Sequence, residues 1–429
     1  MSQPTSWPAP VAAGPLDATV QVPGSKSLTA RYLVLAATAQ GPSRLSGVLQ
    51  ARDTSLMVQA LTTLGAGFVP DVAPTTLRVT PITGLGSSEA AHIDVGLAGT
   101  VMRFVPPIAA LTRAEIRFEG DPAAAHRPVG GLLWALRRLG AVVRGDSLPF
   151  TVAGAGGLDG GAISLDATPS SQYLSALLLA APGFGNGLTV TLDPPTVPSR
   201  PHVDMTLETL RAFGATAAQT TDHQWRVEPG GLTGQDRAIE PDLSNAAPFL
   251  AAALAAGGTV RIPGWPAHTT QPGDLLRGYL EAMGAQVAWT DSAGGTLAVT
   301  GLGAIHGADL DLGPAGELTP TLAALAALAD TPSRFGGIGH LRGHETDRLR
   351  ALSEEINALG GRATELEDGL LIEPSRLHGG TVDARGDHRL ATFGAILGLA
   401  VPGVAIRGIE ATAKTFPTFP ELWLELVRG

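Results

Sequence analysis

SKSLTARYLVLAATA, residues 25–39, begins with polar side chains and then becomes apolar on nearly every helical face. Such a sequence predicts a buried helix whose first turn is available for capping or binding. The pattern recurs about every 73 residues, which indicates a repeat architecture. The other copies are AGTVMRFVPPIAALT from Ala98, SSQYLSALLLAAP from Ser170, LSNAAPFLAAALAAG from Leu243, GELTPTLAALAAL from Gly316 and DHRLATFGAILGLA from Asp387.

A second, amphipathic helix is predicted after each buried one, and it ends at a glycine that is expected to adopt the left-handed conformation of a helix stop. These helices are LMVQALTTLGA, GLLWALRRLGA, VDMTLETLRAFGA, DLLRGYLEAMGA, RLRALSEEINALGG and the terminal ELWLELVRG. Short β-branched segments between the helices, such as 224–228, 286–290 and 369–373, predict strands. The sequence therefore predicts an α/β fold of six βαβαββ units.

Six units can form one closed array or two lobes of three. Boundary signals occur at 20–24, where the chain enters the first unit, and at 237–245, before the fourth. If both segments are hinges, residues 24–240 form one lobe, while 1–23 plus 241–429 form a discontinuous second lobe. A two-lobed protein is expected to bind a small ligand in the cleft between its lobes.

Composition excludes several classes of function. The chain of 429 residues has no cysteine, and its 10 histidines lack metal-ligand spacing, so neither a metal nor another cofactor is expected. A net charge of -10 disfavours nucleic acid and anionic membranes as partners. No apolar stretch has the pattern of a signal peptide or a membrane span. We expect a cytoplasmic, monomeric protein.

Only two of the 29 basic residues are lysine, Lys26 and Lys414. An arginine stays charged, whereas a lysine can be tuned toward proton exchange, so these two are candidates for chemistry. Other polar residues gather at the starts of the predicted helices, where free N–H groups can bind anions. Each also has a plain structural explanation: Ser170 and Asp387 as N-caps, or Arg348 as a helical partner of Glu345.

Motifs along the chain, in order, resemble those of the EPSP synthase family, the 3-phosphoshikimate 1-carboxyvinyltransferases, within the wider enolpyruvyl transferase group. They are PGSKSLTAR, AGTVMR, HRPVGGLLWALRRLG, SSQYLSALLLAAP, HETDRL, DHRLA and AKTFP. The resemblance implies the two-lobed fold with three units per lobe. It also implies transfer of the enolpyruvyl group of phosphoenolpyruvate to the 5-hydroxyl of shikimate 3-phosphate, with release of phosphate, in the shikimate pathway to chorismate and aromatic amino acids.

The resemblance also implies a set of site residues. The catalytic residues are Lys26, Glu317 as proton acceptor, Glu345 as proton donor and Lys414. Shikimate 3-phosphate is expected to contact Lys26, Ser27, Arg31, Ser170, Ser171, Gln172, Ser199, Glu317 and His344, with Arg103 ordering the nearby loop. Phosphoenolpyruvate is expected to contact Lys26, Gly99, Arg127, Gln172, Arg348, Arg389 and Lys414.

Four positions depart from the family pattern. Glu317 stands where aspartate is common, His344 where lysine is common, His202 where tyrosine often contacts the shikimate ring, and Leu97 where asparagine is frequent. These departures leave the two lysines, the arginines and Glu345 in place. They indicate a variation within the family and put individual ligand contacts in question.

The sequence disfavours three alternative functions. A UDP-N-acetylglucosamine enolpyruvyl transferase shares the architecture but often uses a loop cysteine, which this chain lacks. An RNA-terminal phosphate cyclase shares related units, but the acidic net charge disfavours RNA. A non-catalytic anion-binding protein on the same scaffold has no need for so many titratable groups as Lys26, Glu317, Glu345 and Lys414.

Overall fold

The computed structural model describes residues 6–84 and 89–428. Residues 1–5, part of the predicted lobe segment 1–23, and Gly429, the end of the predicted last helix, lie outside the described residues. The chain divides into two compact units. We call Gly24–Ile239 the continuous unit, and Met1–Pro23 with Glu240–Gly429 the discontinuous unit.

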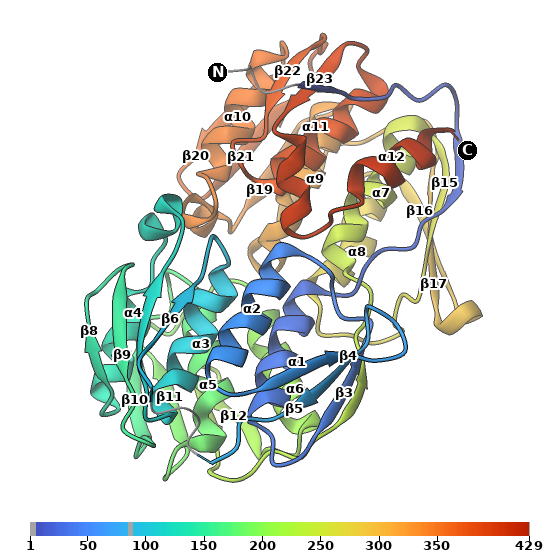
Figure 1. Ribbon diagram of the computed structural model, residues 1–429. Helices are drawn as coiled ribbons and strands as arrows, with labels where there is room; N and C mark the ends of the chain where they lie inside the picture. Colours follow the sequence, from blue (N-terminus) through green and yellow to red (C-terminus); the bar gives the residue numbers. More distant parts are fainter. Residues whose placement is uncertain (1–5, 85–88, 429) are drawn as a thin grey trace. The chain divides into compact units, whose positions relative to one another are not determined.

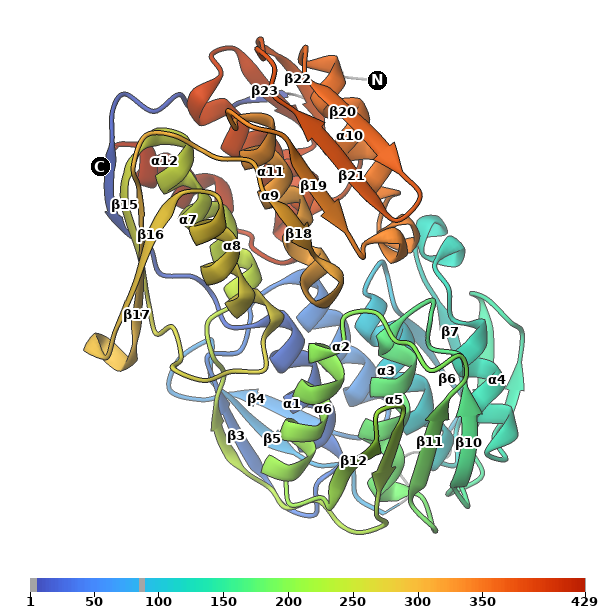
Figure 2. The same ribbon diagram turned by 180° about the vertical axis from the view of Figure 1, so that it is seen from behind.

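In the continuous unit helices α1, α3 and α5 are buried along most of their length, and the sheets lie at its periphery (Figures 1 and 2). The helices are α1 (Lys26–Thr38), α2 (Arg52–Thr63), α3 (Gly99–Leu111), α4 (Gly130–Arg138), α5 (Ser171–Ala180) and α6 (Pro201–Ala212). In its described part the sheet orders are β14-β3-β5-β4, β6-β7-β9-β8 and β10-β11-β13-β12. The strands are β3 (Ser43–Ser46), β4 (Gly67–Pro70), β5 (Leu77–Thr80), β6 (Ala91–Asp94), β7 (Glu115–Glu119), β8 (Val142–Arg144), β9 (Phe150–Ala153), β10 (Gly161–Leu165), β11 (Leu188–Leu192), β12 (Ala217–Thr221), β13 (Gln224–Val227) and β14 (Asp236–Ala238).

The discontinuous unit is built in the same way. Its helices are α7 (Leu243–Ala256), α8 (Leu276–Ala282), α9 (Thr319–Ala327), α10 (Arg348–Ala358), α11 (His388–Ala400) and α12 (Phe419–Arg428). Among its described residues the sheet orders are β16-β17-β15-β2, β18-β19-β21-β20 and β1-β23-β22. The strands are β1 (Ser6–Pro8), β2 (Leu16–Thr19), β15 (Gly258–Pro263), β16 (Ala285–Thr290), β17 (Thr296–Gly301), β18 (Asp309–Asp311), β19 (Ser333–Gly336), β20 (Arg362–Leu366), β21 (Gly369–Glu373), β22 (Gly380–Asp383) and β23 (Val404–Arg407).

Each sheet contains one parallel pair, which requires a crossover connection. The buried helices serve as these crossovers: α3 lies between β6 and β7, α5 between β10 and β11, and α11 between β22 and β23. The remaining pairs are antiparallel: β12 and β13 are joined by a short turn, whereas β11 with β13 and β19 with β21 are separated by a helix and a strand. The predicted alternation of helices and strands in an α/β fold is confirmed.

The predicted glycine stops are confirmed where the structure gives their dihedral angles. Gly65 after α2 has φ 109°, and Gly360 after α10 has φ 84°. A side chain is disfavoured in this left-handed region, so glycine ends these helices without strain. The chain can then turn directly into the next strand.

One predicted helix start is wrong. The pattern from Gly316 predicts a helix that carries Glu317 in its first turn, but α9 begins at Thr319. Residues Gly313–Leu318 instead form the 3-10 helix η5, which is kinked at Ala315 (φ -135°, ψ 46°). The kink interrupts the regular helical backbone just before Glu317. The position of the Glu317 carboxylate is therefore set by this local backbone geometry and not by helix periodicity.

The core of the discontinuous unit is anchored by Phe249 of α7. Its ring lies 5.7, 5.5 and 5.4 Å from the rings of Phe416, Phe419 and Trp423, respectively. All four side chains are buried. Edge-to-face and tilted aromatic contacts of this kind fasten the C-terminal helix α12 to the core.

We predict that Phe249→Ala lowers the free energy of unfolding by about 3–5 kcal/mol, because it leaves a cavity among these rings. Urea unfolding followed by circular dichroism measures the effect. Leu302→Ala is the control, since Leu302 is 69% exposed, and its change should stay within about 0.5 kcal/mol. Equal effects of the two substitutions would contradict the assigned role of Phe249.

Candidate functional site

In the discontinuous unit the start of α11 is organised by Asp387, whose side chain is completely buried. Its carboxylate accepts a hydrogen bond from the backbone N–H of Arg389 (2.8 Å), so Asp387 is the N-cap that the sequence allowed for. The same carboxylate accepts two bonds from Arg348, from Nε at 2.7 Å and from Nη2 at 3.2 Å. A forked ion pair thereby ties α10 to α11.

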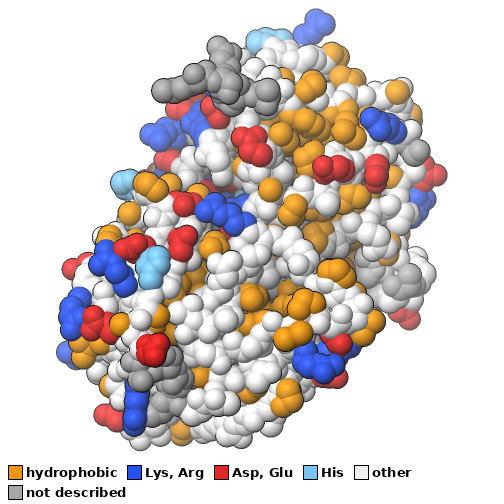
Figure 3. Space-filling model, in the orientation of Figure 1, with side chains coloured by type: hydrophobic (Ala, Val, Ile, Leu, Met, Phe, Trp, Pro, Cys, Tyr) orange, Lys and Arg blue, Asp and Glu red, His pale blue; other side chains and the backbone are white. Residues whose placement is uncertain are grey.

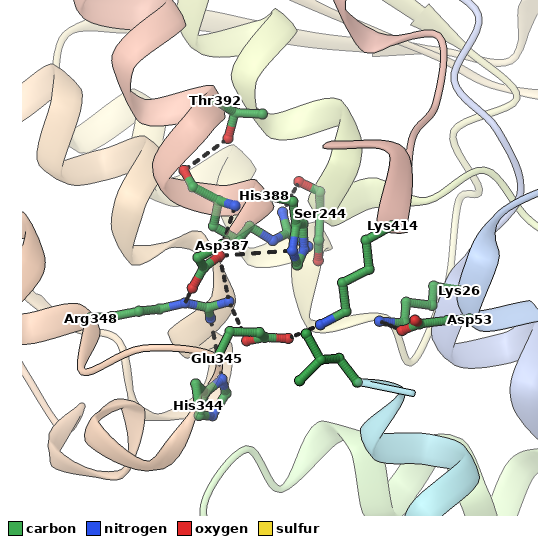
Figure 4. Close-up of polar contacts among 12 residues, drawn as sticks. Lys26, Asp53, Ser244, His344, Glu345, Arg348, Asp387, His388, Thr392 and Lys414 are labelled. Atoms are coloured by element: carbon green, nitrogen blue, oxygen red, sulfur yellow. Dashed lines mark hydrogen bonds and ion pairs between the residues drawn. The ribbon is translucent and has the colours of Figure 1, made fainter. Parts of the chain in front are cut away.

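Glu345 lies between two cations, as Figure 4 shows. Its Oε2 accepts from Nη2 of Arg348 at 3.0 Å, and its Oε1 accepts from Nζ of Lys414 at 2.6 Å. The side chains of Glu345 and Lys414 are each only 9% exposed. Three predicted site residues are thus brought together, and the expected helical pairing of Arg348 with Glu345 is one part of a larger network.

Charges within this cluster affect its arginines in opposite directions. Burial opposes the charged form of Arg348, but Asp387 and Glu345 outweigh this effect, and the pKa of Arg348 is raised. Burial dominates at Arg389, whose pKa is lowered despite the nearby carboxylate of Asp242. Arg348 is therefore already compensated by acids, whereas Arg389 is a buried cation for which an anionic ligand would supply further charge compensation.

Glu317 and Arg389 are linked through one serine. The backbone carbonyl of Ser244 accepts from Nη1 of Arg389 at 2.7 Å, and its hydroxyl donates to Oε1 of Glu317 at 3.3 Å. Ser244 belongs to the first turn of α7. Sequence reasoning missed this residue, although it follows Asp242 and Leu243 at the start of a predicted buried helix.

In the continuous unit Lys26 opens α1 and forms an ion pair with Asp53 of α2, with Nζ 2.6 Å from Oδ2. Asp53 is 3% exposed and Lys26 is 23% exposed. The pair therefore joins a partly exposed ammonium group to a buried carboxylate. Sequence reasoning missed Asp53; an acid in the first turn of a predicted helix was the available signal, and helix capping explains that signal equally well.

The start of α3 brings together Gly99, Arg103, Arg127 and Gln172. A Cβ on Gly99 would lie 2.8 Å from Nη2 of Arg127 and 2.9 Å from Nη1 of Arg103, so the missing side chain admits both guanidinium groups. Arg103 donates to Gln172 (2.9 Å) and, through two nitrogens, to the carbonyl of Pro128 (3.1 and 2.6 Å). Two cations beside a helix N-terminus favour an anion.

Arg127 donates from Nη1 to the carbonyl of Leu97 at 2.8 Å, while its buried Nε has no partner among the described residues. A buried donor without an acceptor is costly. The sequence predicted Arg127, Gly99 and Gln172 as parts of one binding site, and the fold of this unit places all three near the start of α3. Arg103 contributes the bond to Pro128, in the segment that precedes α4.

Arg31 is directed into the unit. It donates to Thr206 (2.9 Å), to Ser175 (3.3 Å), and to the backbone carbonyls of Ser27 (3.0 Å) and His202 (2.8 Å). Burial lowers its pKa to about 9. The guanidinium therefore joins α1, α5 and α6.

The predicted serines occupy helix starts in the same unit. Ser170 caps α5 by accepting from the N–H of Gln172 at 3.2 Å, and Ser171 is the first residue of that helix. Ser199 lies two residues before α6 and has φ 49°, an uncommon value for serine. Such backbone geometry must be maintained by the surrounding fold.

Within residues 6–84 and 89–428, no group of three or more histidine, aspartate or glutamate side chains is placed to hold a metal ion. The same ranges contain no helix that is long and apolar enough to span a membrane.

Sequence comparison identifies related proteins. A sequence model of the family "EPSP synthase (3-phosphoshikimate 1-carboxyvinyltransferase)" matches residues 11–423. A protein of Kocuria rhizophila named 3-phosphoshikimate 1-carboxyvinyltransferase is 54% identical over 431 residues, which cover 98% of this chain and 96% of the relative.

Solved structures resemble the fold at lower sequence identity. EPSP synthase from Acinetobacter baumannii has a TM-score of 0.81 and 24% identity, covering 98% of each chain. The enolpyruvyl transferase NikO from Streptomyces tendae has a TM-score of 0.74 and 20% identity, covering 97% of this chain and 96% of NikO.

We predict that Asp387→Asn destabilises the protein by about 3–5 kcal/mol, because it removes the charge that compensates buried Arg348. Chemical unfolding at neutral pH measures the loss. Asp17→Asn is the matched control: Asp17 pairs with Arg261, but its side chain is 81% exposed, so the change should cost no more than about 1 kcal/mol. A small loss for Asp387→Asn would show that the network does not depend on its charge.

Proposed function

The chain belongs to the EPSP synthase family, and we propose that it is a 3-phosphoshikimate 1-carboxyvinyltransferase. It transfers the enolpyruvyl group of phosphoenolpyruvate to the 5-hydroxyl of shikimate 3-phosphate, giving 5-enolpyruvylshikimate 3-phosphate and inorganic phosphate. This reaction belongs to the shikimate pathway to chorismate and aromatic amino acids. The observation that carries the assignment is 54% identity to a named relative over 98% of the chain.

Both substrates are anions, and each unit supplies cations suited to them. In the continuous unit Arg127, with an unpartnered buried Nε, lies at the N-terminus of α3. In the discontinuous unit Arg389 is a buried cation with a lowered pKa. Guanidinium groups match carboxylate and phosphate oxygens in pairs. We therefore assign phosphoenolpyruvate to Gly99, Arg127, Gln172, Arg348 and Arg389, with Lys26 and Lys414.

We assign shikimate 3-phosphate to the residues at the starts of α1, α5 and α6, to Glu317 and to His344. The N-terminal N–H groups of these helices favour a phosphate group. The internal bonds of Arg31 support a role in holding these helix starts in position. The proposed set is Lys26, Ser27, Arg31, Ser170, Ser171, Gln172, Ser199, Glu317 and His344.

The reaction proceeds by addition and then elimination through a tetrahedral ketal phosphate. It needs a base for the attacking hydroxyl, an acid for the methylene carbon, and cations for the leaving phosphate. We assign Glu317 as the base and Glu345 as the acid. Lys26 and Lys414 stabilise charge at the reacting centre, and their ion pairs with Asp53 and Glu345 orient the two ammonium groups.

The departures from the family pattern are compatible with this function, because the residues at two of these positions, Leu97 and His202, make their contacts through backbone atoms. Arg127 contacts the carbonyl of Leu97, and Arg31 contacts the carbonyl of His202. His344 lies 3.2 Å through Nδ1 from Nη1 of Arg348. Side-chain changes at positions 97 and 202 therefore retain the contacts that hold Arg127 and Arg31, whereas position 344 contacts Arg348 through its side chain.

The family acts on small molecules, and we propose a monomer in the cytoplasm with no nucleic acid or membrane partner. On the face shown in Figure 3, acidic and basic side chains are interspersed and form no continuous basic stripe. Together with a net charge of -10, this distribution gives little attraction for a polyanion. The rival UDP-N-acetylglucosamine enolpyruvyl transferase function is not favoured by the named relative.

We predict that phosphate release from phosphoenolpyruvate requires shikimate 3-phosphate and proceeds without added metal or nucleotide. A phosphate assay with each substrate omitted in turn measures this requirement. Replacing shikimate 3-phosphate by UDP-N-acetylglucosamine should abolish release. Equal turnover with the two acceptors would overturn the proposed function.

Lys26→Arg and Lys414→Arg are each predicted to lower kcat by about a hundredfold or more. The bulkier guanidinium cannot share protons and cannot occupy the position of Nζ against Asp53 or Glu345. Steady-state kinetics measures the loss, and circular dichroism checks the fold. The reverse exchange at exposed Arg78, Arg78→Lys, serves as the control and should leave kcat unchanged. Near-normal kcat for both lysine variants would refute the assignment.

A further inference from the structure

His340 is held in the 3-10 helix η6 (Gly339–Gly343), which directly precedes the HETDR segment. The N–H of Gly339 donates to Oδ1 of Asp368 at 2.5 Å, and the N–H of Ile338 donates to the carbonyl of Asp368 at 3.2 Å. Asp368 lies between β20 and β21. The backbone beside His340 is thus anchored to the sheet, and the position of its ring is defined.

The two ring nitrogens of His340 have different environments. Nε2 is buried and has no hydrogen-bond partner among the described residues. The backbone of Gly337 favours the protonated form of the ring, as a carbonyl that accepts from a ring N–H does. Since Nε2 has no partner, this donor is Nδ1, and the neutral ring keeps its lone pair on Nε2.

Nε2 faces the residue next to the proposed base. A Cβ on Gly316 would lie 2.9 Å from Nε2 of His340, so the ring packs against the backbone immediately before Glu317. Glycine at 316 is what admits the imidazole. The 3-10 helix η5, kinked at Ala315, therefore places Gly316, the neighbour of Glu317, against this nitrogen, and the charge of Glu317 acts on the ring.

Several charged groups surround the imidazole. Burial lowers the pKa of His340, and this effect is opposed by the carboxylates of Glu317 and Asp368 and reinforced by the guanidinium of Arg348. The ring of His344 lies 5.9 Å away between centroids. The imidazole is consequently neutral at pH 7, in the form that can accept a hydrogen bond at Nε2.

We propose that His340 is a positioning residue for Glu317: its Nε2 accepts a hydrogen bond from the Glu317 carboxyl group after that group has taken the proton of the attacking hydroxyl. The inference rests on the proposed function and assigns a role to a residue outside the predicted site. It concerns the proton-accepting half of the reaction only.

The proton is accounted for at each step. The O–H bond of the acceptor hydroxyl breaks as its oxygen bonds to the substituted carbon of phosphoenolpyruvate, and the proton goes to a carboxylate oxygen of Glu317. The resulting neutral carboxyl group becomes a donor, which needs an acceptor in a buried site. His340 Nε2 provides that acceptor, and no oxidant or reductant takes part.

The variant His340→Asn tests the two ring nitrogens separately. The amide of asparagine can replace Nδ1–H as donor to Gly337, but it has no basic group at the position of Nε2. We expect kcat to fall at least about tenfold, less than for loss of the acid or base itself, because His340 acts through Glu317. The dissociation constant of shikimate 3-phosphate, measured by calorimetry, should stay within about threefold. Gly316→Ala, which displaces the ring from the other side, should also lower kcat.

The pH dependence of kcat gives a readout that a purely structural role would not change. In the native protein kcat should fall at acid pH as the imidazole is protonated. Because burial lowers the pKa of His340, this fall should occur below the ordinary histidine pKa of about 6.5. His340→Asn should lack this fall. His306→Asn is the matched control, since His306 is 54% exposed and pairs with Asp330, and its profile should match that of the native protein.

Two results would overturn the inference. One is a His340→Asn variant with native kcat and an unchanged pH profile. The other is a loss of kcat with the native acid limb retained, which would assign His340 a structural role only. Absence of phosphate release by the native protein would instead refute the proposed function, so the two failures are distinguishable.

Discussion

The positive charge of a buried guanidinium must be compensated by nearby acceptors or acids. The candidate site in the discontinuous unit depends on how this is done for Arg348. Asp387 serves Arg348 and the N-terminus of α11 with one carboxylate, so the ion pair and the helix start cannot form separately. Glu345 then connects Arg348 to Lys414. Because each buried charge is fixed by the next, the geometry of the cluster is maintained before any substrate binds.

Two buried arginines of the continuous unit, Arg31 and Arg103, have neutral hydrogen-bond acceptors. Arg31 binds hydroxyl and carbonyl oxygens, and Arg103 binds Pro128 and Gln172. Neutral partners leave net positive charge inside this unit, whereas Asp387 and Glu345 cancel much of it around Arg348. The two units therefore compensate their buried arginines in different ways, and in each unit a cation remains that an anionic ligand can compensate further, Arg127 in one and Arg389 in the other.

Sequence periodicity predicted the α/β class and most helices, because an apolar helix with a polar first turn is a strong local signal. It failed at Glu317, where the backbone is kinked at Ala315 and the regular helix begins only at Thr319. The resemblance supplied the residues to which we assign chemical roles. Their partners Asp53, Ser244 and His340 were missed, since a carboxylate, hydroxyl or imidazole acquires such a role only through neighbours distant in sequence.

The pairing of β1 with β23 and of β2 with β15 has a consequence for how the chain is made. Ser6 lies opposite Arg407, and Leu16 lies opposite Gly258. Strands β1 and β2 therefore wait for partners synthesised much later, whereas the described strands of the continuous unit are complete by Ala238. Because domains fold as they are synthesised and long loops are slow to close, the strands of the continuous unit can pair before those of the discontinuous unit, in which β2 waits for β15 and β1 waits for β23.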